Sequence, residues 1–290
     1  MLRFVGVAET LRVRAHRLVR ISAPLLTLLL YATAAQSQTE RLKNIFLCNG
    51  EDRSTPDPQI QGCTALIDAG NEKPETVATA YNNRGNAYLA KGEYDLAIKD
   101  FDQSLKVKPE ARTFNNRGVA YKKNGDLDRA LQDFEESIKL NPMSAGTFAN
   151  RAQIYEKQGE YARAAKEYEE AIRLAPSVES AWNGRCWNRA IVGELDDALA
   201  DCNEALRLEP DDAAALDSRA FAYLKKGQWD AAVADYNAAL RLNPKLASSL
   251  YGRGLAKLKA GDTNGGTADI AAAKQIAVNI ADDFASYGVK

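Results

Sequence analysis

The feature that most constrains the fold of this chain is a phrase that repeats about every 34 residues. The segment from Tyr81 to Pro109, YNNRGNAYLAKGEYDLAIKDFDQSLKVKP, is followed from Phe114 to Pro142 by FNNRGVAYKKNGDLDRALQDFEESIKLNP. Six such copies align in frames that begin at Ala78, Ala111, Ala145, Glu179, Ala213 and Ala247. A repeat of this length indicates a solenoid, in which stacked units bury a core that no single unit could bury alone.

Each copy has the residue pattern of two helices joined by a turn. Small residues stand at the eighth and twentieth places, where they let two antiparallel helices approach closely. The fifteenth place is always glycine, which fits the left-handed residue that ends a helix. Proline blocks continuation of the second helix in five copies, at Pro109, Pro142, Pro176, Pro210 and Pro244.

This pattern resembles the tetratricopeptide repeat, whose phrase W-x2-L-G-x2-Y…A-x3-F…P reads in the first copy as Tyr81, Arg84, Gly85, Tyr88, Ala97, Phe101 and Pro109. The resemblance covers residues 78–280 and implies an all-α superhelix of six helix-turn-helix repeats, at 78–110, 111–144, 145–178, 179–212, 213–246 and 247–280. We expect a degenerate N-terminal half-repeat at 38–77, because PQIQGCTALIDAG is similar to the second helix of a copy. A C-terminal capping helix is expected to follow, with 281–290 as the cap.

The first 37 residues have the composition of an export signal. Five arginines precede the apolar run ISAPLLTLLLYATAA, which is too short to span a bilayer comfortably, and small residues follow it as cleavage sites. We therefore interpret 1–37 as a signal peptide and expect a periplasmic or secreted protein, with no membrane insertion after cleavage. The alternatives are an uncleaved membrane anchor and a start codon further downstream. The resemblance to repeats common in bacteria implies an exported bacterial type.

Charge and histidine content narrow the classes of function. Five of the 38 basic residues and one of the 39 acidic residues lie in positions 1–37, so the rest carries a net charge of −5 and does not favour nucleic acid. His16, the only histidine, lies in the same segment. The mature chain therefore cannot build a Ser–His–Asp site or a His-ligated zinc site. We expect no enzyme, no metal and no cofactor, with a carboxylate-based hydrolase as a less favoured alternative.

A charged pair recurs in every copy, with arginine at the seventh place and an acid at the twenty-third. An unpaired, partly buried arginine would be costly, so we expect a structural ladder of Arg–acid pairs at the helix seams rather than an electropositive groove. The pairs are Arg84–Asp100, Arg117–Asp133, Arg151–Glu167, Arg185–Asp201, Arg219–Asp235 and Arg253–Asp269. Pairing between adjacent copies, as in Asp100–Arg117, is the alternative.

Asparagine at the sixth place of the first three copies, at Asn83, Asn116 and Asn150, predicts a peptide-binding groove. An amide can donate to and accept from a peptide backbone, and the similar repeat domain of the O-linked N-acetylglucosamine transferase implies such a ladder. Ordinary hydrated surface asparagines are the alternative. The groove is expected to include the polar residues Asn82, Asn86, Asn115, Lys122 and Lys123.

The same face turns apolar in the last three copies, at Trp187, Phe221, Leu224 and Tyr251. Monomers rarely expose such a patch, so we expect these residues to bind a partner, unless the superhelix buries them or the helical phase differs. The predicted function is a non-catalytic scaffold or adaptor of the bacterial cell envelope that binds an extended segment of a protein or peptide partner in its concave groove. The alternative is a self-associating structural protein that buries the apolar groove in a homodimer.

The cysteines of an exported chain can form disulfides. Cys186 and Cys202 occupy the eighth and twenty-fourth places of one copy, one on each helix, and both places face the core. Cys63 stands in GCTALI much as Cys202 stands in DCNEAL, and Cys48 precedes it by a similar spacing. Two local disulfides, Cys48–Cys63 and Cys186–Cys202, are therefore predicted. Crossed pairing and buried free thiols are the alternatives.

Overall fold

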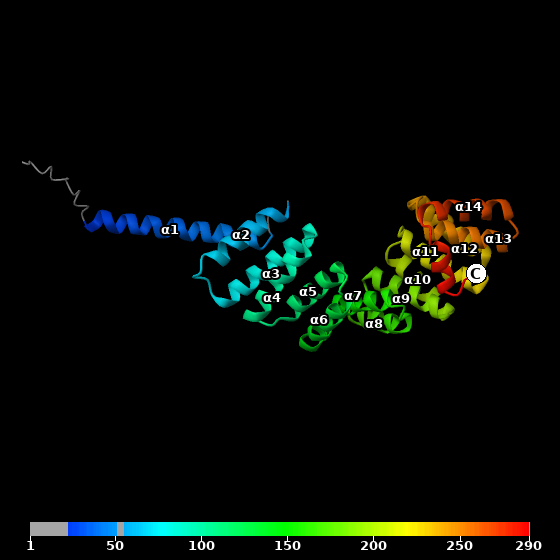
Figure 1. Cartoon of the computed structure of the whole chain (residues 1–290), viewed down its shortest axis with the longest axis horizontal. Coiled ribbons are helices and arrows are strands. Elements are labelled where there is room, and N and C mark those ends of the chain that lie inside the picture. The colour runs from blue at the N-terminus through cyan, green and yellow to red at the C-terminus, as the bar shows by residue number, and fades with distance from the viewer. Residues whose placement is uncertain (1–22, 51–54, 290) are drawn as a thin grey trace, which may run out of the picture.

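A computed structural model describes residues 23–50 and 55–289, and these residues form fifteen helices and no strand (Figure 1). The helices before the repeats are α1 Ala23–Cys48 and α2 Pro56–Asp68. The first helices of the six repeats are α3 Pro74–Lys91, α5 Ala111–Asn124, α7 Ala145–Lys157, α9 Glu179–Val192, α11 Ala213–Lys226 and α13 Ala247–Lys259. Their second helices are α4 Tyr94–Val107, α6 Leu127–Leu140, α8 Tyr161–Leu174, α10 Leu195–Leu208, α12 Trp229–Leu242 and α14 Thr263–Ile276. A short helix, α15 Ile280–Ser286, follows them.

The predicted superhelix of six helix-turn-helix repeats is confirmed. Each first helix packs on its own second helix, and each second helix packs on the first helix of the next repeat. The array is elongated, with α1 at one end and α13 to α15 at the other (Figure 1). Neighbouring first helices also touch each other directly, as α9 and α11 do, so they line the inner, concave face. Of the proposed signal segment, residues 1–22 lie outside the described residues, and residues 23–37 belong to α1.

The turn within each repeat depends on glycine. Gly92, which ends α3, has φ 78°, and the next amide, of Glu93, donates to the carbonyl of Tyr88 at 2.9 Å. This conformation is strained for residues that have a Cβ atom, which explains why glycine holds the fifteenth place.

The core of a repeat is centred on the contact between its eighth and twenty-fourth places. A Cβ added to Gly85 would lie 2.7 Å from Cε1 of Phe101, so the ring packs directly on the glycine backbone. Gly118 and Phe134 repeat this contact. Phe101 and Phe134 are fully buried, and at full burial each ring contributes roughly 1.5–3 kcal/mol of hydrophobic stabilisation.

Both predicted disulfides are confirmed. Cys48 joins Cys63 across α1 and α2 with a Cα–Cα distance of 4.5 Å, and Cys186 joins Cys202 across α9 and α10 with a distance of 5.3 Å. No free cysteine remains between residues 23 and 50 or between 55 and 289. The second disulfide occupies the same two places as the glycine–phenylalanine contact of the first two repeats, so a covalent bond there replaces a packing contact.

The Cys48–Cys63 bond is expected to hold the N-terminal hairpin in place, because few apolar residues pack around it. Its buried cluster contains only Cys48, Cys63, Leu66 and Ala80, with Ile45 and Ile67 at the margin. Closing a loop of 15 residues stabilises the folded state by about 3 kcal/mol in the chain-entropy model. Replacing Cys48 and Cys63 by Ala should therefore speed amide hydrogen exchange in α1 and α2 by about a hundredfold or more.

Replacement of Cys186 and Cys202 by Ala serves as the matched control and should leave exchange in α1 and α2 unchanged. Mass spectrometry of the unreduced protein should find the two local disulfide peptides. A peptide joining Cys63 to Cys186, or a free thiol in the mature chain, would show that this pairing is wrong.

Candidate binding groove

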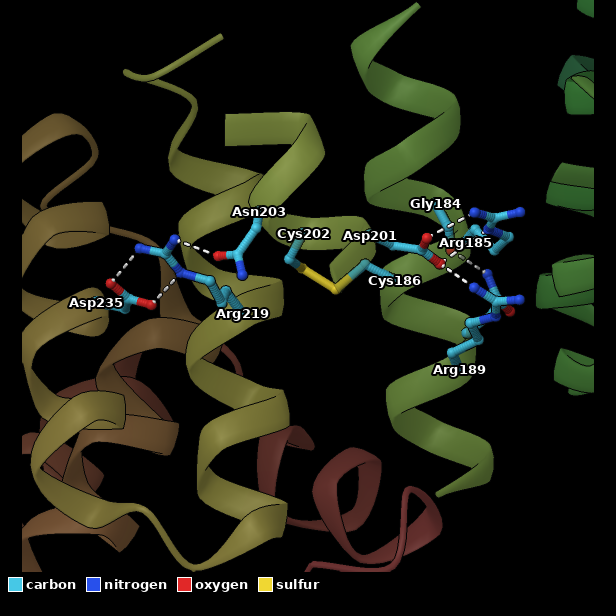
Figure 2. Close-up of a disulfide and its surroundings, with 10 residues drawn as sticks. Gly184, Arg185, Cys186, Arg189, Asp201, Cys202, Asn203, Arg219 and Asp235 are labelled. Carbon is cyan, nitrogen blue, oxygen red and sulfur yellow. Dashed lines mark hydrogen bonds and ion pairs between the residues drawn. A yellow bond between two sulfur atoms is a disulfide. The ribbon is translucent and has the colours of Figure 1, made fainter. Parts of the chain in front are cut away.

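The arginine of every repeat is bound at the helix seam. In all six repeats its Nε and Nη2 donate to the two oxygens of the predicted acid on the second helix, at 2.6 to 2.9 Å. In four repeats Nη1 also reaches the preceding helix, where it donates to Thr64, Asp102, Asn203 or Asn237. Figure 2 shows Arg219 between Asn203 of the preceding repeat and Asp235 of its own. Each of these four arginines therefore joins three helices.

These arginines are not available to a ligand. Their side chains are only 12 to 23% exposed, and their paired acids 3 to 16%. In the first four repeats the guanidinium also lies over the aromatic ring at the fourth place, as Arg185 lies 5.0 Å from the ring centre of Trp182. In the fourth repeat a second arginine, Arg189, donates to Asp201 at 2.6 Å (Figure 2). The geometry is that of a structural staple, not of an electropositive groove.

Removing one staple should destabilise the array far more than removing a surface ion pair. In Arg117→Ala, the carboxylate of Asp133, whose side chain is 5% exposed, would stay buried without its cation. Breaking such a pair costs about 3 kcal/mol, which should lower the midpoint of urea unfolding. The control is Arg173→Ala, because Arg173 and Glu170 are 57% and 43% exposed and their pair contributes at most about 0.5 kcal/mol. Equal shifts in the two variants would contradict the role of Arg117.

The asparagines of the first three repeats bind one another in a relay. Each Nδ2 donates to the Oδ1 of the next at 3.1 to 3.4 Å, in the order Asn150, Asn115, Asn116, Asn82 and Asn83. Lys122 donates to Asn150 at the start, and Asn83 donates to the backbone carbonyl of Cys48 at the end. The relay crosses from α7 to the hairpin of α1 and α2, so these amides connect repeats to each other.

The relay corrects part of the predicted groove. Asn82 is 1% exposed, because Thr113 and Asn116 of the next repeat both bind its Oδ1, so it cannot contact a ligand. Asn83, Asn115, Asn116 and Asn150 stay partly exposed, and their contact with a peptide backbone stays a prediction. Asn86 is also partly exposed.

Three lysines lie together on α5 and α7. Lys122 is 8% exposed, and its Nζ donates to Asn150 at 3.0 Å and Gln153 at 2.7 Å. Burial and the nearby charges of Lys123 and Lys157 lower the pKa of Lys122 to about 8. Lys123 and Lys157 are exposed, and none of the three makes an ion pair with a carboxylate in the described part of the chain. This stretch of the concave face is therefore electropositive.

One partly buried acid, Glu156, borders the lysines. Burial raises its pKa, and its Oε1 accepts a hydrogen bond from Nδ2 of Asn188 at 2.6 Å. Its carboxylate is thus held by α9 and does not pair with Lys122, although it favours the charge of that lysine. Glu156 marks the border between the polar stretch and the apolar half of the face.

The apolar half is covered, which corrects the prediction of an open apolar groove. Phe221 and Leu224 are 1% and 3% exposed, and Trp187 and Tyr251 are partly buried. The covering element is α15, which packs on α13 and α14 and reaches Phe221 of α11 through the ring of Phe284 (Figure 1). This placement was not predicted from the sequence, although Ile280, Phe284 and Tyr287 recur at the spacing of one apolar helical face.

Family models described as tetratricopeptide repeat match residues 78–110, 111–144 and 145–178, and one described as TPR repeat matches 221–261. No curated protein matches the chain. The first three repeats identified from the residue pattern coincide with matches of the family models, and the match at 221–261 overlaps the fifth and sixth.

Solved structures of low sequence identity share the fold. A tetratricopeptide repeat protein from Parabacteroides merdae has a TM-score of 0.63 and 17% identity, over 86% of this chain and 99% of its own. PilF of Pseudomonas aeruginosa has a TM-score of 0.61 and 17% identity, over 74% of this chain and 99% of its own. YrrB, described as having an unusual peptide-binding site, has a TM-score of 0.52 and 17% identity, over 63% of this chain and 94% of its own.

Proposed function

The chain belongs to the tetratricopeptide-repeat family, and we propose that it is a non-catalytic scaffold that binds a protein or peptide partner along its concave face. One observation carries the proposal: Lys122, Lys123 and Lys157 lie together on the face without a carboxylate partner. The three lysines are close enough for the charges of Lys123 and Lys157 to lower the pKa of Lys122, so they form a local concentration of positive charge. A partner that supplies carboxylates would satisfy them.

The partner segment that fits this stretch is acidic and extended. Lys122 is held in its charged form at a cost, since its pKa is lowered to about 8, and a nearby carboxylate would remove that cost. The partly exposed amides beside it, Asn115 and Asn116, keep free donor and acceptor positions for a peptide backbone. YrrB, which shares the fold, is described as having a peptide-binding site, which supports the same class of function.

We further propose that the protein works outside the cytoplasm, as a periplasmic or secreted adaptor. Two disulfides suit an oxidising compartment. Among the residues that the structure describes, no helix has the length and apolar character needed to cross a bilayer. The export signal at residues 1–37 is part of this proposal.

The other candidate functions have less support. Self-association was suggested by an open apolar groove, and α15 covers that groove. A carboxylate hydrolase needs an accessible pair of acids, but the recurring acids bind arginines. At one further pair of acids, burial and the nearby Asp212 raise the pKa of Glu179 to about 7, but Asp212 caps α11 by accepting from the amide of Ala214.

The lysine stretch should bind an acidic peptide. The probe is a fluorescein-labelled eight-residue peptide of alternating Glu and Ala, and binding is read as fluorescence anisotropy at low salt. Lys123→Glu with Lys157→Glu should weaken binding about tenfold or more, because both side chains are exposed and their reversal places like charges against the peptide. Lys106→Glu with Lys166→Glu, on the second helices α4 and α8, makes the same change in net charge and should have little effect. Equal weakening in the two variants would mean non-specific attraction and would refute the proposed stretch.

Binding of this peptide should also depend on pH through Lys122. In the free protein the pKa of Lys122 is about 8, and a bound carboxylate raises it, so the peptide binds with proton uptake. Affinity should therefore be highest below pH 8 and fall as the pH rises towards 9.5. In Lys122→Met this fall should disappear. A fall of the same size in Lys122→Met would assign it to another group.

A further inference from the structure

The helix α15 presents one apolar face to the groove. Ile280, Phe284 and Tyr287 are spaced i, i+4 and i+7, so they lie along the same side of the segment. Ile280 is 7% exposed and Phe284 2%, whereas Asp282 and Asp283 between them are exposed. The segment is thus a short amphipathic helix with its apolar side in the superhelix and its acids in solvent.

Aromatic side chains dominate the contact between α15 and the repeats. The ring of Phe284 lies edge-on to Phe221, with ring centres 5.6 Å apart, and 4.8 Å from the ring centre of Tyr251. Tyr287 lies edge-on to Trp187, with ring centres 5.3 Å apart, and also contacts Phe221 and Tyr161. Three of the four residues predicted to receive a partner, Trp187, Phe221 and Tyr251, therefore bind this segment of the same chain.

A lysine of the groove holds the main chain of the tail. The Nζ of Lys225 donates to the backbone carbonyl of Tyr287 at 2.9 Å and to that of Ile191 at 2.7 Å. Burial lowers the pKa of Lys225. A contact to a backbone carbonyl does not depend on the side chain of the bound residue, so Lys225 could hold any peptide placed there.

The tail helix is held by its contacts with the repeats and not by its own length. A helix of seven residues is not stable on its own in water, so α15 depends on its docking contacts. A cavity of ≈ 180 Å³ remains beside it, between Leu224, Trp229 and Leu255 of the repeats and the tail residues Gly288 and Val289. The groove is therefore larger than the segment that fills it.

We propose that residues 280–289 are an internal ligand that occupies the apolar half of the groove until a partner displaces it. The partner segment is a short amphipathic helix that carries large apolar side chains, at least two of them aromatic, at positions i, i+4 and i+7. This inference rests on the proposed scaffold function and names the chemistry of the partner at its second, apolar half.

A second copy of the chain is the less suitable occupant. The three residues that join α14 to α15 span at most about 11 Å, so α15 could reach the groove of another molecule only if the two molecules lay very close or α14 unwound. A separate partner needs only to replace contacts that already exist. The net free energy of its binding would be the difference between the affinity of the partner segment for the groove and the affinity of the tail for it.

The test uses the full chain and a labelled peptide with the sequence of residues 278–290, VNIADDFASYGVK. Phe284→Ala with Tyr287→Ala should release the tail, so that this variant binds the peptide about tenfold or more tightly than the unaltered chain does. A peptide in which the same two residues are Ala should not bind. Ser286→Ala, an exposed position on α15, is the matched control and should behave as the unaltered chain.

The single substitution Tyr287→Ala keeps the buried Phe284 and preserves the test if the double variant does not fold; it should give intermediate peptide affinity. If the peptide binds the released variants no better than the unaltered chain, α15 is only part of the core and the proposal is wrong. Light scattering that shows a dimer of the released variant would assign the groove to a second copy, which also overturns it.

The two proposed sites can fail separately. The Glu–Ala peptide tests the lysine stretch, and the tail peptide tests the apolar half. If Lys123→Glu with Lys157→Glu loses the Glu–Ala peptide while the released variant still binds the tail peptide, the two sites are independent. Binding of the Glu–Ala peptide alone would uphold the scaffold function and reject the internal ligand.

Discussion

The superhelix depends on an arginine placed where three helices meet. Its planar guanidinium forks onto the acid of its own second helix, and in four repeats its remaining nitrogen reaches the helix before. A buried ion pair adds little net stability compared with apolar packing, but an unpaired one is costly. The arginine therefore sets the angle within a repeat and the stacking between repeats, because any other arrangement would leave a charge buried without a partner. The apolar contacts of the core then pack in the register that these pairs define.

The two halves of the concave face use this scaffold in different ways. In the first three repeats the inner side chains are amides and lysines, and they bind to each other from one repeat to the next. In the last three the inner side chains are aromatic or aliphatic, and they bind a helix of the same chain. Glu156, partly buried at the border and hydrogen-bonded to Asn188, lies between the polar, electropositive half and the apolar half.

The parts that sequence could predict are those whose contacts lie within one repeat. The Arg–acid pairs and the Cys186–Cys202 bond join places that recur at a fixed distance along the chain, so six aligned copies were enough to find them. Asn82 was misplaced because its burial comes from Thr113 and Asn116 of the next repeat, and periodicity within one helix does not report that contact. The position of α15 was missed for a related reason. It stands outside the repeat, and the spacing of its apolar residues indicates a helix with one apolar face but not which surface that face will cover.

The disulfides also determine how the array responds to a pulling force. A solenoid whose units contact only their neighbours can be drawn out one unit at a time. The bond between Cys186 and Cys202 keeps the chain between them from extending. This shortens the fully extended length of the protein by roughly 50 Å. The segment from Cys186 to Cys202, which contains the turn of the fourth repeat, therefore stays closed under tension, and extension is confined to the chain outside it. The covalent bond that replaces one glycine–aromatic contact thus makes this part of the array resist extension.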